Sequence, residues 1–109
     1  MSTYTVIPTE EFLRWKNSFG PRHREVTRRI AARQLAMTEG HFGHTRSVGK
    51  GVTETKIDFG PVYRLYYTIR QNVVIVLLIG GDKTTQQQDI LRAQDLAANL
   101  PEDLLPTQE

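Results

Sequence analysis

The stretch GVTETKIDFGPVYRLYYTIRQNVVIVLLIGGDK, residues 51–83, decides the fold of this chain. Its central segment, Val62–Arg70, alternates sharply between residue types, which predicts a β-strand with two distinct faces. Residues 73–79 are apolar throughout, so we expect a strand inside the sheet with both faces covered. Residues 52–57 are polar and alternating, as an edge or one-sided strand would be. On the central strand the two faces carry Tyr63, Leu65, Tyr67 and Ile69 on one side, and Arg64 and Tyr66 on the other.

The Phe-Gly-Pro sequence between the first two of these strands sets their register. If the turn has three residues, Lys56 lies opposite Arg64, and Glu54 lies opposite Tyr66. A turn of four residues would instead place Thr55 opposite Tyr66. Both alternatives are compatible with the sequence.

The second connection, Gln71-Asn72, is predicted to be a two-residue hairpin turn because Asn tolerates a positive φ. This turn pairs Arg64 with Ile79. The chain then leaves the last strand through a Gly-Gly pair near Arg64, which brings Lys83 within reach of the same site.

The N-terminal part of the chain predicts a short strand at residues 3–7 and two helices. The first helix begins after Thr9, a preferred N-cap residue, and two acidic residues in its first turn favour the positive end of the helix dipole. A Gly-Pro pair ends it, and the short connection implies an antiparallel second helix over residues 22–38.

The glycine-rich segment 40–51 is predicted to be a loop, with or without a short strand at residues 45–48. Residues 85–88 match the capping-box pattern, which predicts the start of a final helix ending before Pro101. Residues 101–109 are expected to form a flexible tail. We therefore predict a single α+β domain over residues 1–109. It has two N-terminal antiparallel helices, a mostly antiparallel twisted sheet of three to four strands, a C-terminal helix, and helices on only one face of the sheet.

Composition places this chain of 109 residues among ordinary globular proteins. It has no Cys, which excludes disulfides, a thiolate nucleophile and Cys-based metal sites. The longest apolar run, at residues 73–79, is too short to span a bilayer, and the N-terminus has no secretory signal pattern. We expect a cytoplasmic protein without a membrane contact.

Charge is distributed unevenly along the chain. Residues 1–81 carry twelve Lys and Arg against six Asp and Glu, whereas residues 82–109 carry two against six. A basic body with an acidic end suits a polyanionic partner, although solubility alone would also explain it. The candidate RNA-binding residues are Arg28, Arg29, Arg33 and Arg46.

The polar face of the central strand is the candidate site. Lys56, Arg64 and Lys83 would form a cationic group with the phenol of Tyr66 beside it. Such a group binds phosphate, with Arg acting bidentately and Lys as a point charge. The alternative is a merely solvated sheet face.

Other motifs carry less weight. His41 and His44 lie in the loop without nearby carboxylate partners, apart from Glu39, so no metal is expected. His44 could act as a general acid if the loop folds over the sheet. The Gly-Gly-Asp-Lys-Thr-Thr run lacks the spacing of a phosphate-binding P-loop. We expect a structural turn there that directs Lys83 at the site.

Taken together, residues 51–67, the apolar strand that follows, and residues 80–90 resemble the RelE/ParE toxin superfamily. The likeness is greatest to the HigB-like group of addiction module killer proteins. Its pattern runs G-x-x-E-x-R-I-D-x-G-P-G-Y-R-x-Y, then L-L-x-G-G-D-K-x-x-Q-x-x-D-I. The resemblance covers about residues 10–100, with Val62 in place of a Gly and Lys56 in place of an Arg.

This resemblance implies the toxin of a type II toxin–antitoxin pair. Such toxins mostly cleave mRNA, typically on the ribosome, without a metal or other cofactor, by attack of a 2′-hydroxyl on the adjacent phosphate. Arg64 would bind the scissile phosphate, Lys83 and Lys56 would supply further charge or a proton, and Tyr66 would act as an acid, a base or a stacking residue. The partner would be a helix-turn-helix antitoxin encoded by a neighbouring gene. A gyrase-inhibiting toxin and a non-catalytic binding module of the same fold are the alternatives.

Overall fold

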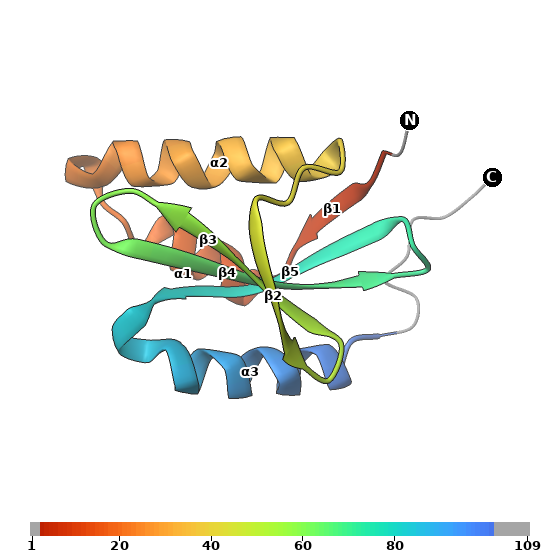
Figure 1. The fold of residues 1–109 in the computed structure, drawn as a ribbon. Helices are drawn as coiled ribbons and strands as arrows, with labels where there is room; N and C mark the ends of the chain where they lie inside the picture. Colours follow the sequence, from red (N-terminus) through yellow and green to blue (C-terminus); the bar gives the residue numbers. More distant parts are fainter. Residues whose placement is uncertain (1–2, 102–109) are drawn as a thin grey trace.

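The computed structural model describes residues 3–101 and contains a five-stranded sheet with three α-helices (Figure 1). The strand order is β1-β5-β4-β3-β2, and β1 is parallel to β5 while the other pairs are antiparallel. The predicted α+β class is confirmed, with five strands in place of three or four. The expected tail at 102–109 lies outside the described residues. The elements are β1 (Thr5–Pro8), α1 (Glu10–Asn17), α2 (Arg24–Thr38), β2 (His44–Gly49), β3 (Val52–Asp58), β4 (Val62–Arg70), β5 (Val74–Asp82) and α3 (Gln86–Ala98), with 3₁₀ turns at Pro21–His23 and Lys83–Thr85.

The N-terminal helix begins as its sequence predicts. The hydroxyl of Thr9 accepts a hydrogen bond from the backbone N–H of Phe12 at 3.1 Å, which caps α1. The same hydroxyl donates to the carbonyl of Leu78 at 2.8 Å. One residue thus follows β1, starts α1 and fastens both to the neighbouring strand β5.

The sheet is covered on both faces, so the prediction of helices on one face is wrong. In Figure 1, α2 lies above the sheet and α3 below it. The first core joins α1, α2 and the sheet, and it includes Phe12, Ile30, Leu65 and Leu77. The second core lies under α3 and includes Tyr66, Val76, Leu78, Ala93 and Ala97. The physical reason is β5, whose side chains are apolar on both faces and need a helix on each.

The pairing of β4 with β5 also differs from the prediction. The connection has three residues, and both Gln71 and Asn72 adopt positive φ, at 51° and 61°. A bulge then shifts the register between Tyr66 and Tyr67. As a result, Arg64 lies opposite Gly81 and not opposite Ile79.

The Gly-Gly pair lies within β5, which continues to Asp82, so the predicted end of the strand there is wrong. Each glycine instead allows a close approach from one side. A Cβ at Gly80 would overlap the ring of Trp15 in α1, and one at Gly81 would overlap the carboxylate of Asp89 in α3. Both helices therefore pack directly against the backbone of β5 at this point.

Candidate functional site

A pocket of about 400 Å³, here called the sheet-face pocket, lies on the α3 side of the sheet. The three-residue turn is confirmed, because Lys56 pairs with Arg64 and Glu54 pairs with Tyr66. Strand β2 adds His44 opposite Lys56 and Arg46 opposite Glu54. Directly opposed residues share a face, so these pairs bring several cationic groups together. The lining residues are His44, Thr45, Arg46, Glu54, Lys56, Arg64 and Gln86.

Glu54 is the centre of the polar contacts in this pocket, with only 1% of its side chain exposed. Its Oε2 accepts hydrogen bonds from the Tyr66 hydroxyl and from Gln86 Nε2, both at 3.0 Å. Its Oε1 lies 3.4 Å from Arg46 Nε. Burial alone would raise the pKa of Glu54, but the hydrogen bonds from Gln86 and Tyr66, together with the charge of Arg46, outweigh burial and lower it. Glu54 is therefore a buried carboxylate at neutral pH.

Arg64 is nearly enclosed, with a relative exposure of 7%. Its Nε lies 3.6 Å from Glu54 Oε2, which is an ion-pair contact but too long for a hydrogen bond. Both Nε and Nη1 are buried without a hydrogen-bond partner among the described residues. A buried donor left unpaired costs about 1–3 kcal/mol, and more when it is charged. The guanidinium is therefore a nearly buried cation, and its charge adds to those of Arg46 and Lys56 in the same pocket.

Arg64 also lines a second pocket of about 410 Å³, here called the turn pocket. This pocket contains Lys83, so the structure places the two predicted phosphate ligands at one cavity. Lys83 begins a 3₁₀ turn that Asp82 caps, through a hydrogen bond of 2.9 Å from the backbone N–H of Thr84. The other lining residues are Pro61, Val62, Asp82 and Thr84.

The capping box predicted for the last helix is wrong. The Thr85 hydroxyl makes no cap to the helix backbone, and it donates to Asp89 Oδ2 at 2.6 Å. Burial raises the pKa of Asp89. The 3₁₀ turn before α3 takes the place of the capping box.

Tyr66 has no exposed surface because α3 covers it. Burial raises the pKa of its hydroxyl, and the nearby charge of Glu54 raises it further. Its hydroxyl is engaged with Glu54 Oε2. In this arrangement the phenol supports the buried carboxylate and does not reach the surface of the pocket.

The predicted RNA-binding arginines do not lie together. Arg28 and Arg29 are on α2, which covers the opposite face of the sheet, and both pair with Glu25, at 2.7 Å and 3.2 Å. The guanidinium of Arg29 also lies 4.4 Å from the centre of the Phe59 ring. Arg46 is the one in the sheet-face pocket, where its side chain is 60% exposed.

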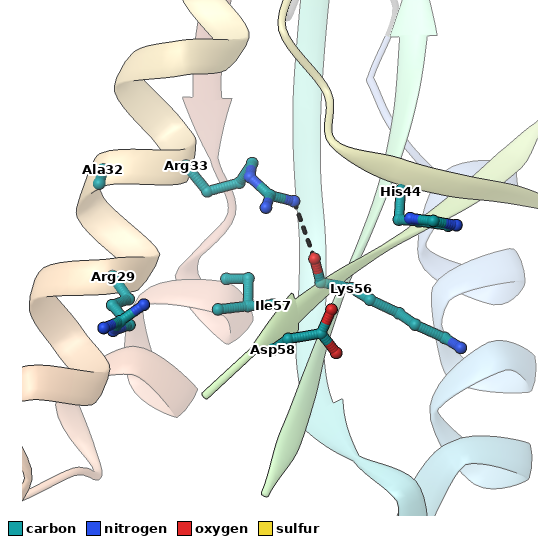
Figure 2. Close-up of a pocket in the computed structure, with 7 residues that line it drawn as sticks. All are labelled: Arg29, Ala32, Arg33, His44, Lys56, Ile57 and Asp58. Carbon is teal, nitrogen blue, oxygen red and sulfur yellow. Dashed lines mark hydrogen bonds between the residues drawn. The ribbon is translucent and has the colours of Figure 1, made fainter. Parts of the chain in front are cut away.

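Arg33 is half-buried and held in place by hydrogen bonds (Figure 2). Its Nη1 donates to the Thr55 hydroxyl at 2.5 Å, to the carbonyl of Lys56 at 2.9 Å and to that of Phe42 at 3.3 Å. These bonds fasten α2 to β3 and to the loop before β2. Figure 2 also shows the side chain of Lys56 extending away from α2. A pocket of about 430 Å³ on this side is lined by Arg29, Ala32, Arg33, His44, Lys56, Ile57 and Asp58.

The sequence predicted Glu54 opposite Tyr66 but assigned it no role, and it did not indicate Gln86 as a member of the pocket. It indicated His44 only for the case in which the loop folds over the sheet, and the structure places His44 in the pocket. Nothing local in the sequence connects Gln86 to Arg64. Within residues 3–101, no cluster of three His, Cys, Asp or Glu side chains could hold a metal ion.

Comparison with known proteins defines the relationships of the chain. No family model matches it. An uncharacterized protein of Haemophilus influenzae is 43% identical over 72 residues, which are 66% of this chain and 73% of that protein. No helix in residues 3–101 is long and apolar enough to cross a membrane.

Two solved structures share the fold. A mutant of the Escherichia coli toxin RelE in the free state has a TM-score of 0.63 and 18% identity, over 90% of this chain and 99% of that one. A chain of the RelBE2 toxin–antitoxin complex of Mycobacterium tuberculosis has a TM-score of 0.58 and 19% identity, over 74% of this chain and 99% of that one. The predicted RelE/ParE likeness is thus confirmed for the fold, and the HigB-like group stays a prediction. The chain belongs to one protein family with the Haemophilus influenzae protein, and its fold is that of the RelE toxins.

Proposed function

We propose that this chain is the toxin of a type II toxin–antitoxin system and that it cleaves mRNA. The observation that carries the proposal is Arg64, a nearly buried guanidinium with two unpartnered nitrogens. The pocket around it also contains the cationic side chains of Arg46 and Lys56. These three positive charges would attract an RNA phosphate to the pocket. The shared fold with two RelE structures supports the same assignment.

The proposed reaction is a transesterification within the RNA chain. The 2′-oxygen forms a bond to the adjacent phosphorus while the bond from phosphorus to the 5′-oxygen breaks, which leaves a cyclic phosphate and a free 5′-hydroxyl. Arg64 binds the non-bridging oxygens, where charge develops. His44, the imidazole in the sheet-face pocket, takes the proton of the 2′-hydroxyl. Lys83, in the turn pocket on the other side of Arg64, gives a proton to the departing 5′-oxygen.

The proposed partners are the mRNA, the ribosome and a helix-turn-helix antitoxin from a neighbouring gene. One of the two structures with this fold is a toxin–antitoxin complex. A carboxylate of an antitoxin could satisfy Arg64 in the same way as a phosphate. Catalysis would then proceed in the cytoplasm after the antitoxin is lost.

The proposal is tested by inducible expression of the wild type, Arg64→Ala and Arg64→Lys in bacteria. We expect the wild type to stop growth and protein synthesis and to create new mRNA 5′ ends. Arg64→Ala should abolish these effects, and Arg64→Lys should weaken them because it loses bidentate binding. Arg14→Ala, an exposed arginine on α1, is the matched control and should behave as the wild type.

Circular dichroism must first show that each variant is folded. Equal growth arrest by the wild type and Arg64→Ala would contradict the assignment of the site. Growth arrest with intact mRNA and loss of DNA supercoiling would identify a gyrase inhibitor instead. The antitoxin is tested by co-expression with the neighbouring gene, which should restore growth and co-purify its product.

A further inference from the structure

The two pockets on either side of Arg64 differ in their chemistry. In the sheet-face pocket, Arg46 and Lys56 add positive charge around the guanidinium. In the turn pocket, two apolar residues, Pro61 and Val62, take part in the lining. A phosphate suits the first lining, whereas the second combines hydrocarbon with a few polar groups. This combination is typical of a pocket for a flat organic ring.

The position of Val62 follows from the geometry of β4. It precedes Arg64 by two residues, so both side chains lie on the same face of the strand. Val62 is half-buried at the first position of the strand, directly after the exposed Pro61. The hydrocarbon surface is thus one strand repeat away from the guanidinium, which is close enough for adjacent parts of one nucleotide.

Asp82 decides what kind of ligand this pocket favours. It lines the pocket and accepts two hydrogen bonds from Thr84, from its backbone N–H at 2.9 Å and from its hydroxyl at 2.6 Å. The hydrogen bond from the Thr84 hydroxyl is the main cause that lowers the pKa of Asp82, so the carboxylate is charged at neutral pH. This charge offsets that of Lys83 in the same pocket, so the turn pocket attracts a second phosphate less strongly than the sheet-face pocket does. The N–H groups of a neutral base would be attracted to the carboxylate.

We infer that the turn pocket binds one nucleobase of the polynucleotide whose phosphate Arg64 holds. The base lies against Val62 and Pro61, and its exocyclic amino group faces Asp82. This inference rests on the proposed function, because it needs an RNA phosphate at Arg64. Val62 stands where the pattern that the chain resembles has Gly, so the apolar wall is a property of this chain.

The test measures binding of three labelled heptamers by fluorescence anisotropy. All three are 2′-O-methylated, so none has the nucleophile needed for cleavage: oligoadenylate, oligouridylate and a strand of abasic sugars. The wild type should bind oligoadenylate about tenfold more tightly than the abasic strand, the amount that contact with one base supplies. Oligouridylate, whose base has no exocyclic amino group, should lie between them.

Two substitutions then separate the contributions of the apolar wall and of Asp82 to base binding. Val62→Gly should reduce the advantage of oligoadenylate over the abasic strand to threefold or less. Asp82→Asn should bring the affinities of oligoadenylate and oligouridylate together. Val73→Gly, an exposed valine at the opposite end of β4 and β5, is the matched control and should change neither ratio. Arg64→Ala should weaken the binding of all three heptamers by the same factor.

The possible outcomes are distinguishable. An unchanged ratio in folded Val62→Gly, or an abasic strand that binds as tightly as oligoadenylate to the wild type, overturns the nucleobase pocket alone. Failure of the wild type to bind any heptamer, or an Arg64→Ala variant that binds as well as the wild type, overturns the proposed function as well.

Discussion

Replacement of Glu54 by Gln should destabilise the protein at neutral pH, because it leaves Arg64 buried without its nearest negative charge. The two charges are 3.6 Å apart. At an effective dielectric constant of about 20, unit charges at this distance attract by roughly 4–5 kcal/mol. Removal of one partner of a buried ion pair typically costs about 3–5 kcal/mol. The amide of Gln can still accept from Tyr66 and Gln86, so we expect a loss of about 3 kcal/mol.

The loss should depend on pH in a defined direction. The pKa of folded Glu54 lies below its ordinary value of 4.5. As the pH falls, the unfolded chain therefore takes up this proton before the folded chain does. The stability that the charge contributes is fully present above about pH 4.5 and is lost as the pH falls through the folded-state pKa. The difference between the wild type and Glu54→Gln should narrow over this acidic range.

The assay is urea unfolding followed by the fluorescence of Trp15, the single tryptophan of the chain. With a slope of about 1.5 kcal/mol per molar urea, a loss of 3 kcal/mol lowers the midpoint by about 2 M. Glu39→Gln, at an exposed acid after α2, is the control and should unfold as the wild type does. A loss below about 1 kcal/mol at pH 7, or a difference that stays constant into acid, would refute the role given to Glu54.

Three further predictions concern the fold and the ligand. Gly81→Ala should lower the unfolding free energy by about 2 kcal/mol, because the added Cβ would overlap the carboxylate of Asp89. Gly20 has open space around it, so Gly20→Ala should have little effect in the same urea assay. Arg33→Met should speed amide exchange in the loop at residues 40–43 by at least tenfold, since three hydrogen bonds are lost, whereas Arg14→Met should not. RNA affinity should fall about twentyfold between 50 and 200 mM salt if roughly three phosphates are neutralised, and a flat response in a salt titration would exclude a phosphate clamp.

The elements that could be predicted from the sequence are those with a local physical cause. The alternation of Val62–Arg70 matches β4, because period two needs no knowledge of the rest of the chain. Thr9 caps α1 because the capping interaction spans only three residues. The pairing of Lys56 with Arg64 followed from the length of one turn. In each case the forces act within one strand, one turn or one helix end.

The register of β5 shows why other features could not be predicted. The turn after Arg70 is one residue longer than expected. This change alone would shift the β4–β5 pairing by one residue, so that Arg64 would share a face with the other set of alternating β5 residues. The bulge between Tyr66 and Tyr67 adds a second shift of one residue, which restores the face. Arg64 therefore keeps its predicted side of the sheet but lies opposite Gly81. A bulge is stabilised by packing on both sides of the sheet, so it cannot be predicted from a short stretch of sequence.

The candidate site was predictable in its members but not in its burial. Periodicity put Arg64 and Tyr66 on a polar face that was expected to be open to solvent. Helix α3 covers Tyr66 completely and leaves Arg64 at 7% exposure, and that docking depends on residues more than 20 positions away in the sequence. The environment of Arg33 also differs from the one expected from the sequence, for a similar reason. Its helix position suggests an exposed side chain, but the loop before β2 folds back and supplies the carbonyl of Phe42 as an acceptor.

The burial of Arg64 also bears on how such a protein would be controlled. Two unpaired nitrogens on a guanidinium make the free protein less stable than it would be with an apolar residue of similar size. On the proposed function, a phosphate of RNA and a carboxylate of an antitoxin would both be attracted to the small exposed part of this guanidinium. Because both need the same position beside Arg64, the two ligands exclude each other. On the proposed function, an antitoxin that inserts one acidic side chain at Arg64 would therefore block RNA binding without covering the rest of the pocket.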